Sequence, residues 1–233
     1  MIRALDVASS IGATLARAAS GAQVGTLGAR PAQPLSLYEF EGCPYCRKVR
    51  EALSILDLEA DVFPCPKRGP RFRPEVVRRG GKAQFPYLVD PNTGIELYES
   101  DAIVAYLFDR YGDGRVPWAL SLGPLTDLSA QAASLWRPAA GVFYAPARAP
   151  EQPLELWSFE ASPFSRLVRE KLSVLELPYR LHNVAKGSAH RAAFVERSGK
   201  MMVPYLADPN TGKEMFESAD IVEYLDETYA IRS

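Results

Sequence analysis

The alternation of apolar and polar positions predicts the same series of elements twice along the chain. Val49, Leu53 and Leu56 recur at helical spacing among arginine and glutamate residues, which predicts an amphipathic helix. Turn-forming residues at 90–94 separate two short apolar runs, which predicts a β-hairpin. The first half reads as strand 35–40, helix 44–57, strand 60–64, helix 71–80, strand 86–90, strand 95–98 and helix 100–111. The second half reads as strand 154–159, helix 163–176, strand 179–184, helix 190–198, strand 204–208, strand 213–216 and helix 218–229.

This parallel order reflects an internal duplication. Residues 35–65 align with residues 154–184, and the motif Pro-Tyr-Leu-x-Asp-Pro-Asn-Thr-Gly occurs at 86–94 and again at 204–212. A weaker similarity upstream gives each half a leading helix and a proline-rich arm. We therefore expect two α/β domains that pack against each other. The predicted limits are an N-terminal helix and arm over 1–34, a first domain over 35–114, a linker helix and arm over 115–153, and a second domain over 154–233.

Composition narrows the class of protein. The 233 residues are 47% hydrophobic and 24% charged with a net charge of -1, and no basic stripe suggests a nucleic-acid partner. No apolar run is long enough to predict a membrane span. Three cysteines argue against a secreted disulfide framework, so we expect a reducing compartment such as the cytoplasm. The N-terminus has the composition of a transit peptide, but its internal counterpart favours a helix packed through Ile2, Leu5, Ile11 and Leu15.

The candidate chemistry lies in Cys43-Pro44-Tyr45-Cys46, which follows the first strand and opens the first helix. Free N–H groups and the positive dipole end of a helix stabilise a thiolate there, so its pKa falls below the usual value of about 8.5. Cys46 lies one turn later and can close a disulfide with Cys43. We predict that Cys43 is the nucleophile and Cys46 the resolving thiol.

The third cysteine, Cys65, ends the strand that we expect to run parallel beside the first strand. It is either an accessory thiol near the active site or a small buried apolar residue, which is the usual state of a free cysteine. A structural zinc site needs four ligands. The first half offers three cysteines and no histidine, so we expect no metal site.

The Cys43–Cys46 motif resembles the dithiol signature of glutaredoxins, and Glu99-Ser100 resembles the glutathione-binding pair of glutathione transferase N-terminal domains. As a whole, the chain is similar to tandem glutaredoxin-like, glutathione transferase N-terminal-like proteins of plant plastids and photosynthetic bacteria. The resemblance implies two tandem thioredoxin-like domains with Pro86 and Pro204 in cis. It also implies a cytoplasmic location, or a plastid one if the source is a photosynthetic eukaryote.

The same resemblance implies how glutathione binds the first domain. Its cysteine would pair with the backbone of Phe85, and its γ-glutamyl carboxylate would lie at the helix N-terminus at Ser100. Glu99 would meet its ammonium group. Arg73 would either hold the glycyl carboxylate or be a solvated charge. The implied glutathione-binding residues are Tyr45, Arg73, Phe85, Pro86, Glu99 and Ser100.

The second half has lost all three cysteines, which are replaced by Ser162, Ser165 and Val184. Serine cannot form a disulfide, so we predict that this domain is redox-silent and is either a second glutathione site or a structural or partner-binding unit. The equivalents of the first-domain residues are Ser162, Arg191, Val203, Pro204, Glu217 and Ser218.

The leading functional hypothesis is a glutathione-dependent thiol–disulfide oxidoreductase that acts on a disulfide or a glutathionylated thiol. The alternatives are a conjugating glutathione transferase and a non-catalytic glutathione- or partner-binding module. A glutathione-ligated iron–sulfur cluster on Cys43 stays open, although the Pro44-Tyr45 pair resembles forms that generally hold none.

Overall fold

The computed structural model describes residues 9–10, 21–121 and 140–231. The predicted helix through Ile2, Leu5, Ile11 and Leu15 and the centre of the linker lie outside the described residues. The predicted series of elements is confirmed in both halves, with ends displaced by one or two residues, as is usual for element boundaries. The first half contains β1 (Leu35–Glu39), α2 (Pro44–Ile55), β2 (Ala60–Pro64), α3 (Arg73–Gly80), β3 (Tyr87–Asp90), β4 (Ile95–Tyr98) and α4 (Ser100–Tyr111), followed by the short α5 (Trp118–Ser121). The second contains β5 (Leu154–Ser158), α7 (Pro163–Val174), β6 (Tyr179–Asn183), α8 (Arg191–Ser198), β7 (Tyr205–Asp208), β8 (Lys213–Phe216) and α9 (Ser218–Tyr229).

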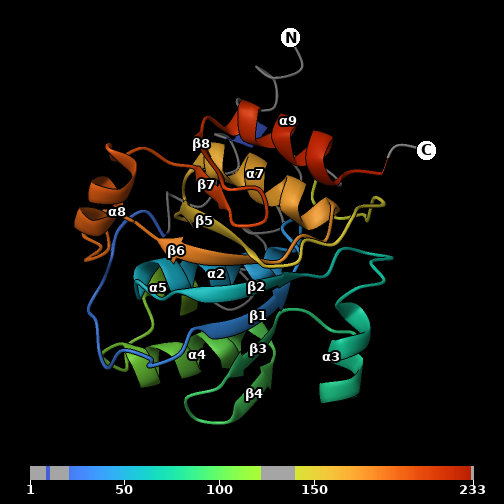
Figure 1. The fold of residues 1–233 in the computed structure, drawn as a ribbon. Helices are drawn as coiled ribbons and strands as arrows, with labels where there is room; N and C mark the ends of the chain where they lie inside the picture. The colour runs from blue at the N-terminus through green and yellow to red at the C-terminus, as the bar shows by residue number, and fades with distance from the viewer. Residues whose placement is uncertain (1–8, 11–20, 122–139, 232–233) are drawn as a thin grey trace.

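The two thioredoxin-like halves form a single eight-stranded sheet in the order β4-β3-β1-β2-β6-β5-β7-β8. In each half a parallel pair, β1–β2 or β5–β6, is extended by an antiparallel hairpin. The halves meet where β2 and β6 run antiparallel (Figure 1). At the centre of this seam Asp61 lies opposite Arg180, whose Nε and Nη2 donate to the carboxylate at 2.8 and 3.0 Å.

One continuous apolar core is shared by both halves. It joins residues of α2 and α4 to residues of α7 and α9, for example Leu53, Leu107, Leu172 and Leu225, all of which are fully buried. Two smaller clusters pack the other helices, with Val76 of α3 in one and Phe194 of α8 in the other. The shared core makes the duplicated halves one packed body, which confirms the expectation that they pack together. Among the described residues, no helix is both long and apolar enough to cross a membrane.

Candidate functional site

Cys43 occupies the N-cap position of α2, as the sequence motif predicts. Its backbone is extended, with φ of -82° and ψ of 121°, and its Sγ accepts the backbone N–H of Cys46 at 3.3 Å. Pro44 follows at the first helical position, where its missing N–H costs nothing. The sulfur therefore takes the place that a serine or aspartate oxygen takes at an ordinary helix start.

The pKa values of the two cysteines in the motif are shifted in opposite directions. A hydrogen bond from the Cys46 thiol is the largest cause lowering the pKa of Cys43, and burial acts in the opposite direction. Burial, followed by the hydrogen bond with Cys43, raises the pKa of Cys46 well above its usual value. Cys43 is 5% exposed and Cys46 is fully buried. The hydrogen bond between the two sulfurs thus favours the thiolate form of Cys43 and the protonated form of Cys46.

Aromatic and basic side chains pack around the cis-proline segment before β3. The Phe85–Pro86 peptide is cis, and the Phe85 ring packs edge-on against Phe40 at 6.3 Å between ring centroids. The Arg73 guanidinium lies 4.7 Å from the centroid of the Phe85 ring, and its Nε donates to the Pro66 carbonyl at 2.7 Å. Arg73 is therefore anchored beside the cis-proline segment, while Tyr45 is exposed on the first turn of α2.

The start of α4 lies beside the same segment. Ser100 is the first helical residue, and Glu99 precedes it with a φ of 68°, in the left-handed region. The Glu99 carboxylate accepts a hydrogen bond from the Gln84 side-chain amide, next to Phe85. This contact brings together the two stretches to which the resemblance assigns glutathione binding.

Sequence reasoning missed a further link between α2 and α4. Lys48, whose side chain is fully buried, contacts Asp101 at 2.5 Å. In the second half Leu167 and Ala219 stand at the aligned positions, so an apolar pair replaces the ion pair. This paired replacement is the signal that could have revealed the contact.

The second half repeats the frame without sulfur. Ser162 is the N-cap of α7, and its Oγ accepts the backbone N–H of Ser165 at 3.2 Å and the Ser165 hydroxyl at 2.8 Å. The Val203–Pro204 peptide is cis, and Glu217, with a φ of 67°, precedes Ser218 at the start of α9. Arg191 donates from Nε to the Val184 carbonyl at 3.1 Å, as Arg73 does to Pro66.

Cys65 has the surroundings of a buried structural residue. It is fully buried, its backbone N–H donates to the Glu39 carbonyl at 2.6 Å, and its thiol lies 3.4 Å from the Phe63 carbonyl. Burial raises its pKa well above the usual value for a thiol. These observations favour the apolar-residue interpretation over that of an accessory thiol.

A layer of buried charges between the halves was also missed by the sequence reasoning. Arg50 donates from Nε to Glu160 at 3.0 Å, and Arg169, its counterpart in the repeat, donates from Nε to Glu41 at 3.0 Å. Arg169 Nη2 also lies 2.9 Å from Glu160. Burial alone would raise the pKa of Glu160, but Arg169 and Arg50 outweigh it and lower that pKa to about 2.

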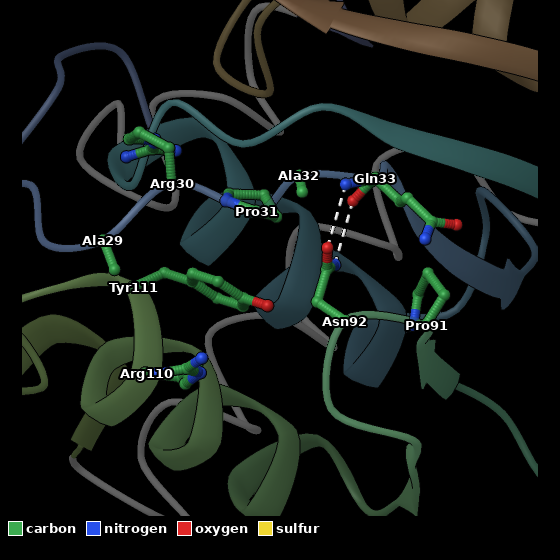
Figure 2. Close-up of a pocket in the computed structure, with 9 residues that line it drawn as sticks. All are labelled: Ala29, Arg30, Pro31, Ala32, Gln33, Pro91, Asn92, Arg110 and Tyr111. Atoms are coloured by element: carbon green, nitrogen blue, oxygen red, sulfur yellow. Dashed lines mark hydrogen bonds between the residues drawn. The ribbon is translucent and has the colours of Figure 1, made fainter.

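A cavity of about 370 Å³ lies away from the dithiol, between the N-terminal arm and the end of α4 (Figure 2). Two hydrogen bonds join the arm to the β3–β4 turn at this cavity. The Gln33 backbone N–H donates to Asn92 Oδ1 at 2.8 Å, and Asn92 Nδ2 donates to the Gln33 carbonyl at 3.0 Å. Arg30 donates from Nη2 to the Leu56 and Asp57 carbonyls at the end of α2. None of the predicted site residues lines this cavity.

Within the described residues, no group of three or more histidine, cysteine, aspartate or glutamate side chains is placed to hold a metal ion.

Comparison with solved structures gives partial matches to glutathione transferases. The Bombyx mori glutathione transferase BmGSTD1 is 30% identical over 36% of this chain and 38% of its own, with a TM-score of 0.33. A delta-class glutathione transferase of Nilaparvata lugens is 32% identical over 34% of this chain and 37% of its own, with a TM-score of 0.31. Leishmania TDR1, a trimeric glutathione transferase, is 15% identical over 87% of this chain and 68% of its own, with a TM-score of 0.30. The chain thus matches less than half the length of the two insect enzymes.

The comparison with curated proteins gave no match. The family model for the glutathione S-transferase N-terminal domain matches the chain twice, at residues 37–115 and 156–233. These two matches fall on the two thioredoxin-like halves and together cover more than half of the sequence. The chain therefore belongs to the glutathione S-transferase N-terminal domain family and carries that domain in two tandem copies.

Proposed function

We propose that this protein is a glutathione-dependent thiol–disulfide oxidoreductase with Cys43 as its nucleophile. The observation that carries the proposal is the Cys43 sulfur itself. It lies at a helix N-cap, its pKa is lowered by the Cys46 hydrogen bond, and a second thiol lies within reach. The family assignment supports glutathione as the small thiol that takes part.

The chemistry follows from the difference between the two sulfurs. The Cys43 thiolate attacks one sulfur of a glutathionylated thiol or another disulfide and forms a mixed disulfide with it. The second sulfur of the substrate disulfide leaves as a thiolate. Cys46 then attacks the Cys43 sulfur, the thiol bound to Cys43 leaves as its thiolate, and the internal Cys43–Cys46 disulfide closes. Because Cys46 is fully buried, it is protected from external disulfides and acts only after Cys43 has reacted.

Glutathione would bind along the cis-proline segment and the start of α4. The first-turn N–H groups of α4 at Ser100 suit a carboxylate, since a helix N-terminus favours an anion. Glu99 would meet the ammonium group by exchanging its Gln84 partner for the ligand. Arg73, held against Phe85, would supply the positive charge for the second carboxylate. As part of the same proposal we place the protein in a reducing compartment, the cytoplasm or a plastid.

The test is reduction of a glutathionylated peptide by the whole chain, with glutathione as reductant. Cys43→Ser should abolish turnover, and Cys46→Ser should leave a monothiol route. Alkylation of Cys43 with iodoacetamide across pH should give a pKa below about 8.5. Full turnover by Cys43→Ser would refute the proposal. A Cys43 pKa near 8.5 without reductase activity would favour the non-catalytic binding module.

A second candidate is glutathione conjugation at Ser162. The supporting observation is that the Ser162 hydroxyl accepts two hydrogen bonds at the start of α7, in a half that also keeps the cis peptide bond before Pro204. A hydroxyl in this position can hold the thiolate of glutathione. Conjugation of 1-chloro-2,4-dinitrobenzene by Cys43→Ser, together with its loss in Ser162→Ala, would establish this activity. Absence of conjugation in the wild-type chain would exclude it for this electrophile.

A further inference from the structure

The cavity between the N-terminal arm and the end of α4 has a positively charged lining. Two of the described residues that line it are arginines, and none of them is acidic. Arg30 comes from the arm and Arg110 from α4, and in the view of Figure 2 they lie on either side of Tyr111. The other lining residues are alanine, proline, glutamine and asparagine. This lining suits an anion better than a cation or a neutral molecule.

Hydrogen bonds fix the walls of this cavity. The Gly28 N–H donates to the Tyr111 carbonyl at 2.8 Å, and Gln33 is bound to Asn92 at the other end of the arm. The Arg30 Nη2 donates to two carbonyls at the end of α2, at 2.8 and 3.0 Å. Its Nε and Nη1 make no hydrogen bond within the described part of the chain. The guanidinium group is therefore held in place with donors left for a ligand.

The second arginine packs on an aromatic ring. The Arg110 guanidinium lies 5.9 Å from the centroid of the Tyr111 ring, and no described carboxylate lies within ion-pair distance of it. The Tyr111 hydroxyl donates to Asp90 at 2.5 Å, and this buried carboxylate also accepts from Tyr106 and Asn92. The charge of Asp90 is thus satisfied by neutral donors within the protein. Arg110 keeps its charge for a group that enters the cavity.

The second half repeats the frame of the cavity. The Arg148 N–H donates to the carbonyl of the last residue of α9 at 2.8 Å, and Gln152 pairs with Asn210 at 2.8 and 3.0 Å. The first arm makes the same bonds at the same places on its half. Residues 148–152 of the linker arm therefore correspond to residues 28–33, with one residue fewer.

The charges of the two frames differ. Thr228 stands at the position of Arg110. The linker arm carries Arg148 and Glu151, whose charges cancel, whereas the corresponding stretch of the first arm carries Arg30 alone. The first frame thus has two positive charges and the second has no net charge. Because the frame is kept without this charge in the second half, the two arginines serve something other than the attachment of the arm.

We propose that this cavity binds a phosphate monoester of a small polar molecule. Such an ester carries a charge of about -1.5 to -2 at pH 7, which matches the two arginines. Guanidinium groups bind phosphate oxygens through pairs of N–H donors. The Gln33 amide and the Pro91 ring line the rest of the cavity and would contact the organic part. The volume of about 370 Å³ lies at the low end of the roughly 300–1,000 Å³ of small-molecule sites, which suits a ligand of a few carbon atoms.

The binding test is isothermal titration calorimetry of the whole chain in a phosphate-free buffer. Glycerol 3-phosphate and ribose 5-phosphate are the probes, and we expect each to saturate a single site. Glycerol and ribose, which lack the phosphate, should not bind. Succinate has two separate carboxylates in place of one phosphate and should bind about tenfold more weakly or worse. Raising the salt concentration should weaken binding of both esters, because salt screens the arginines.

Substitution of the exposed arginines tests the location of the site. Arg110→Thr, which introduces the residue of the second half, should weaken binding of both esters about tenfold or more through loss of a charge-assisted contact. Arg110→Lys, which keeps the charge but not the fork, should bind with intermediate affinity. Arg148→Gln is the matched control in the linker arm and should bind like the wild type. All three variants should keep the wild-type rate of Cys43 alkylation, because none of the predicted redox residues lines the cavity.

A measurement on the wild type locates the ligand without any variant. Phenylglyoxal modifies accessible arginines, and its sites are read by peptide mass spectrometry. Glycerol 3-phosphate should protect Arg30 and Arg110 from modification while Arg148 reacts at an unchanged rate.

The proposal fails if neither ester binds at concentrations up to about 10 mM. It also fails if succinate binds as tightly as the esters, or if Arg110→Thr and Arg148→Gln weaken binding equally. Modification of Arg110 at the same rate with and without the ester would also refute it. None of these results depends on the activity of Cys43, so this inference and the proposed oxidoreductase function stand or fall separately.

Discussion

Glu160→Gln is the substitution that best tests the charge layer between the halves. Glu160 is 2% exposed, and its carboxylate receives Arg50 at 3.0 Å and Arg169 at 2.9 Å. The substitution keeps the shape and a hydrogen-bonding group but removes the negative charge. Two buried guanidinium groups then share only the remaining carboxylates.

The magnitude follows from the pKa of Glu160. The ordinary value is 4.5 and the folded protein lowers it to about 2. At about 1.4 kcal/mol per pKa unit, the folded state stabilises the ionised form by roughly 3 kcal/mol at neutral pH. Removing one partner from a buried ion pair commonly costs about 3–5 kcal/mol, which is consistent. Because the folded pKa is lowered, this stability is present above pH 4.5 and is lost as pH falls towards 2.

The assay is urea unfolding of the full chain followed by circular dichroism. At pH 7 we expect Glu160→Gln to lower the free energy of unfolding by roughly 3 kcal/mol, with a smaller difference from wild type below pH 4. Glu75→Gln is the matched control, because Glu75 pairs with Arg78 and Arg79 on the exposed face of α3. That variant should lose less than about 1 kcal/mol. Equal losses for the two variants at pH 7 would refute the reasoning.

Three other predictions follow from buried contacts. Because the pKa of Glu39 is raised from 4.5 to about 7 in the folded protein, its ionisation destabilises the fold progressively between these pH values and fully above pH 7. The melting temperature of Glu39→Gln minus that of the wild type, measured by calorimetry, should therefore increase between pH 5 and pH 8. A Cβ at Gly28 would lie 2.3 Å from the Gly112 carbonyl oxygen, so Gly28→Ala should cost about 1–3 kcal/mol and expose the arm to limited proteolysis; unchanged cleavage would contradict this. Cys65→Ala should leave the rate of Cys43 alkylation at neutral pH unchanged, as read by mass spectrometry, because Cys65 is fully buried; a slower rate would favour the accessory-thiol interpretation.

The elements of the fold were predictable because apolar spacing is a local property. Leu53 and Leu56 define the apolar face of a helix regardless of what packs on it. The turn residues at 90–94 indicate a hairpin without any information from the rest of the chain. The cis geometry at Pro86 and Pro204 was expected only from the resemblance, since spacing does not distinguish cis from trans. The position of Cys43 at a helix start was predictable for the same local reason, because the motif itself specifies the start of the helix.

The charge layer could not be predicted from local patterns. Arg47 and Arg50 have the spacing of a solvent-facing helix surface, and only the second half makes that surface an interior. The repeat did contain a signal, since Arg166 and Arg169 retain these arginines where both cysteines of the motif were replaced. Retention of charge after loss of chemistry indicates a structural role. Glu39 was missed because a single acid at a strand end has no pattern of its own.

The charges at the seam between β2 and β6 favour the pairing of unlike copies of the domain. Asp61 and Arg180 occupy equivalent positions of the repeat and face each other across the seam. Two copies of the first half, paired in this register, would oppose aspartate to aspartate, and two copies of the second would oppose arginine to arginine. Like charges directly across a strand pair are destabilising. Because this one position has diverged, the charges at the seam attract when a first half pairs with a second half and repel when two identical halves pair. In this respect the chain is like a heterodimer whose two subunits are covalently joined.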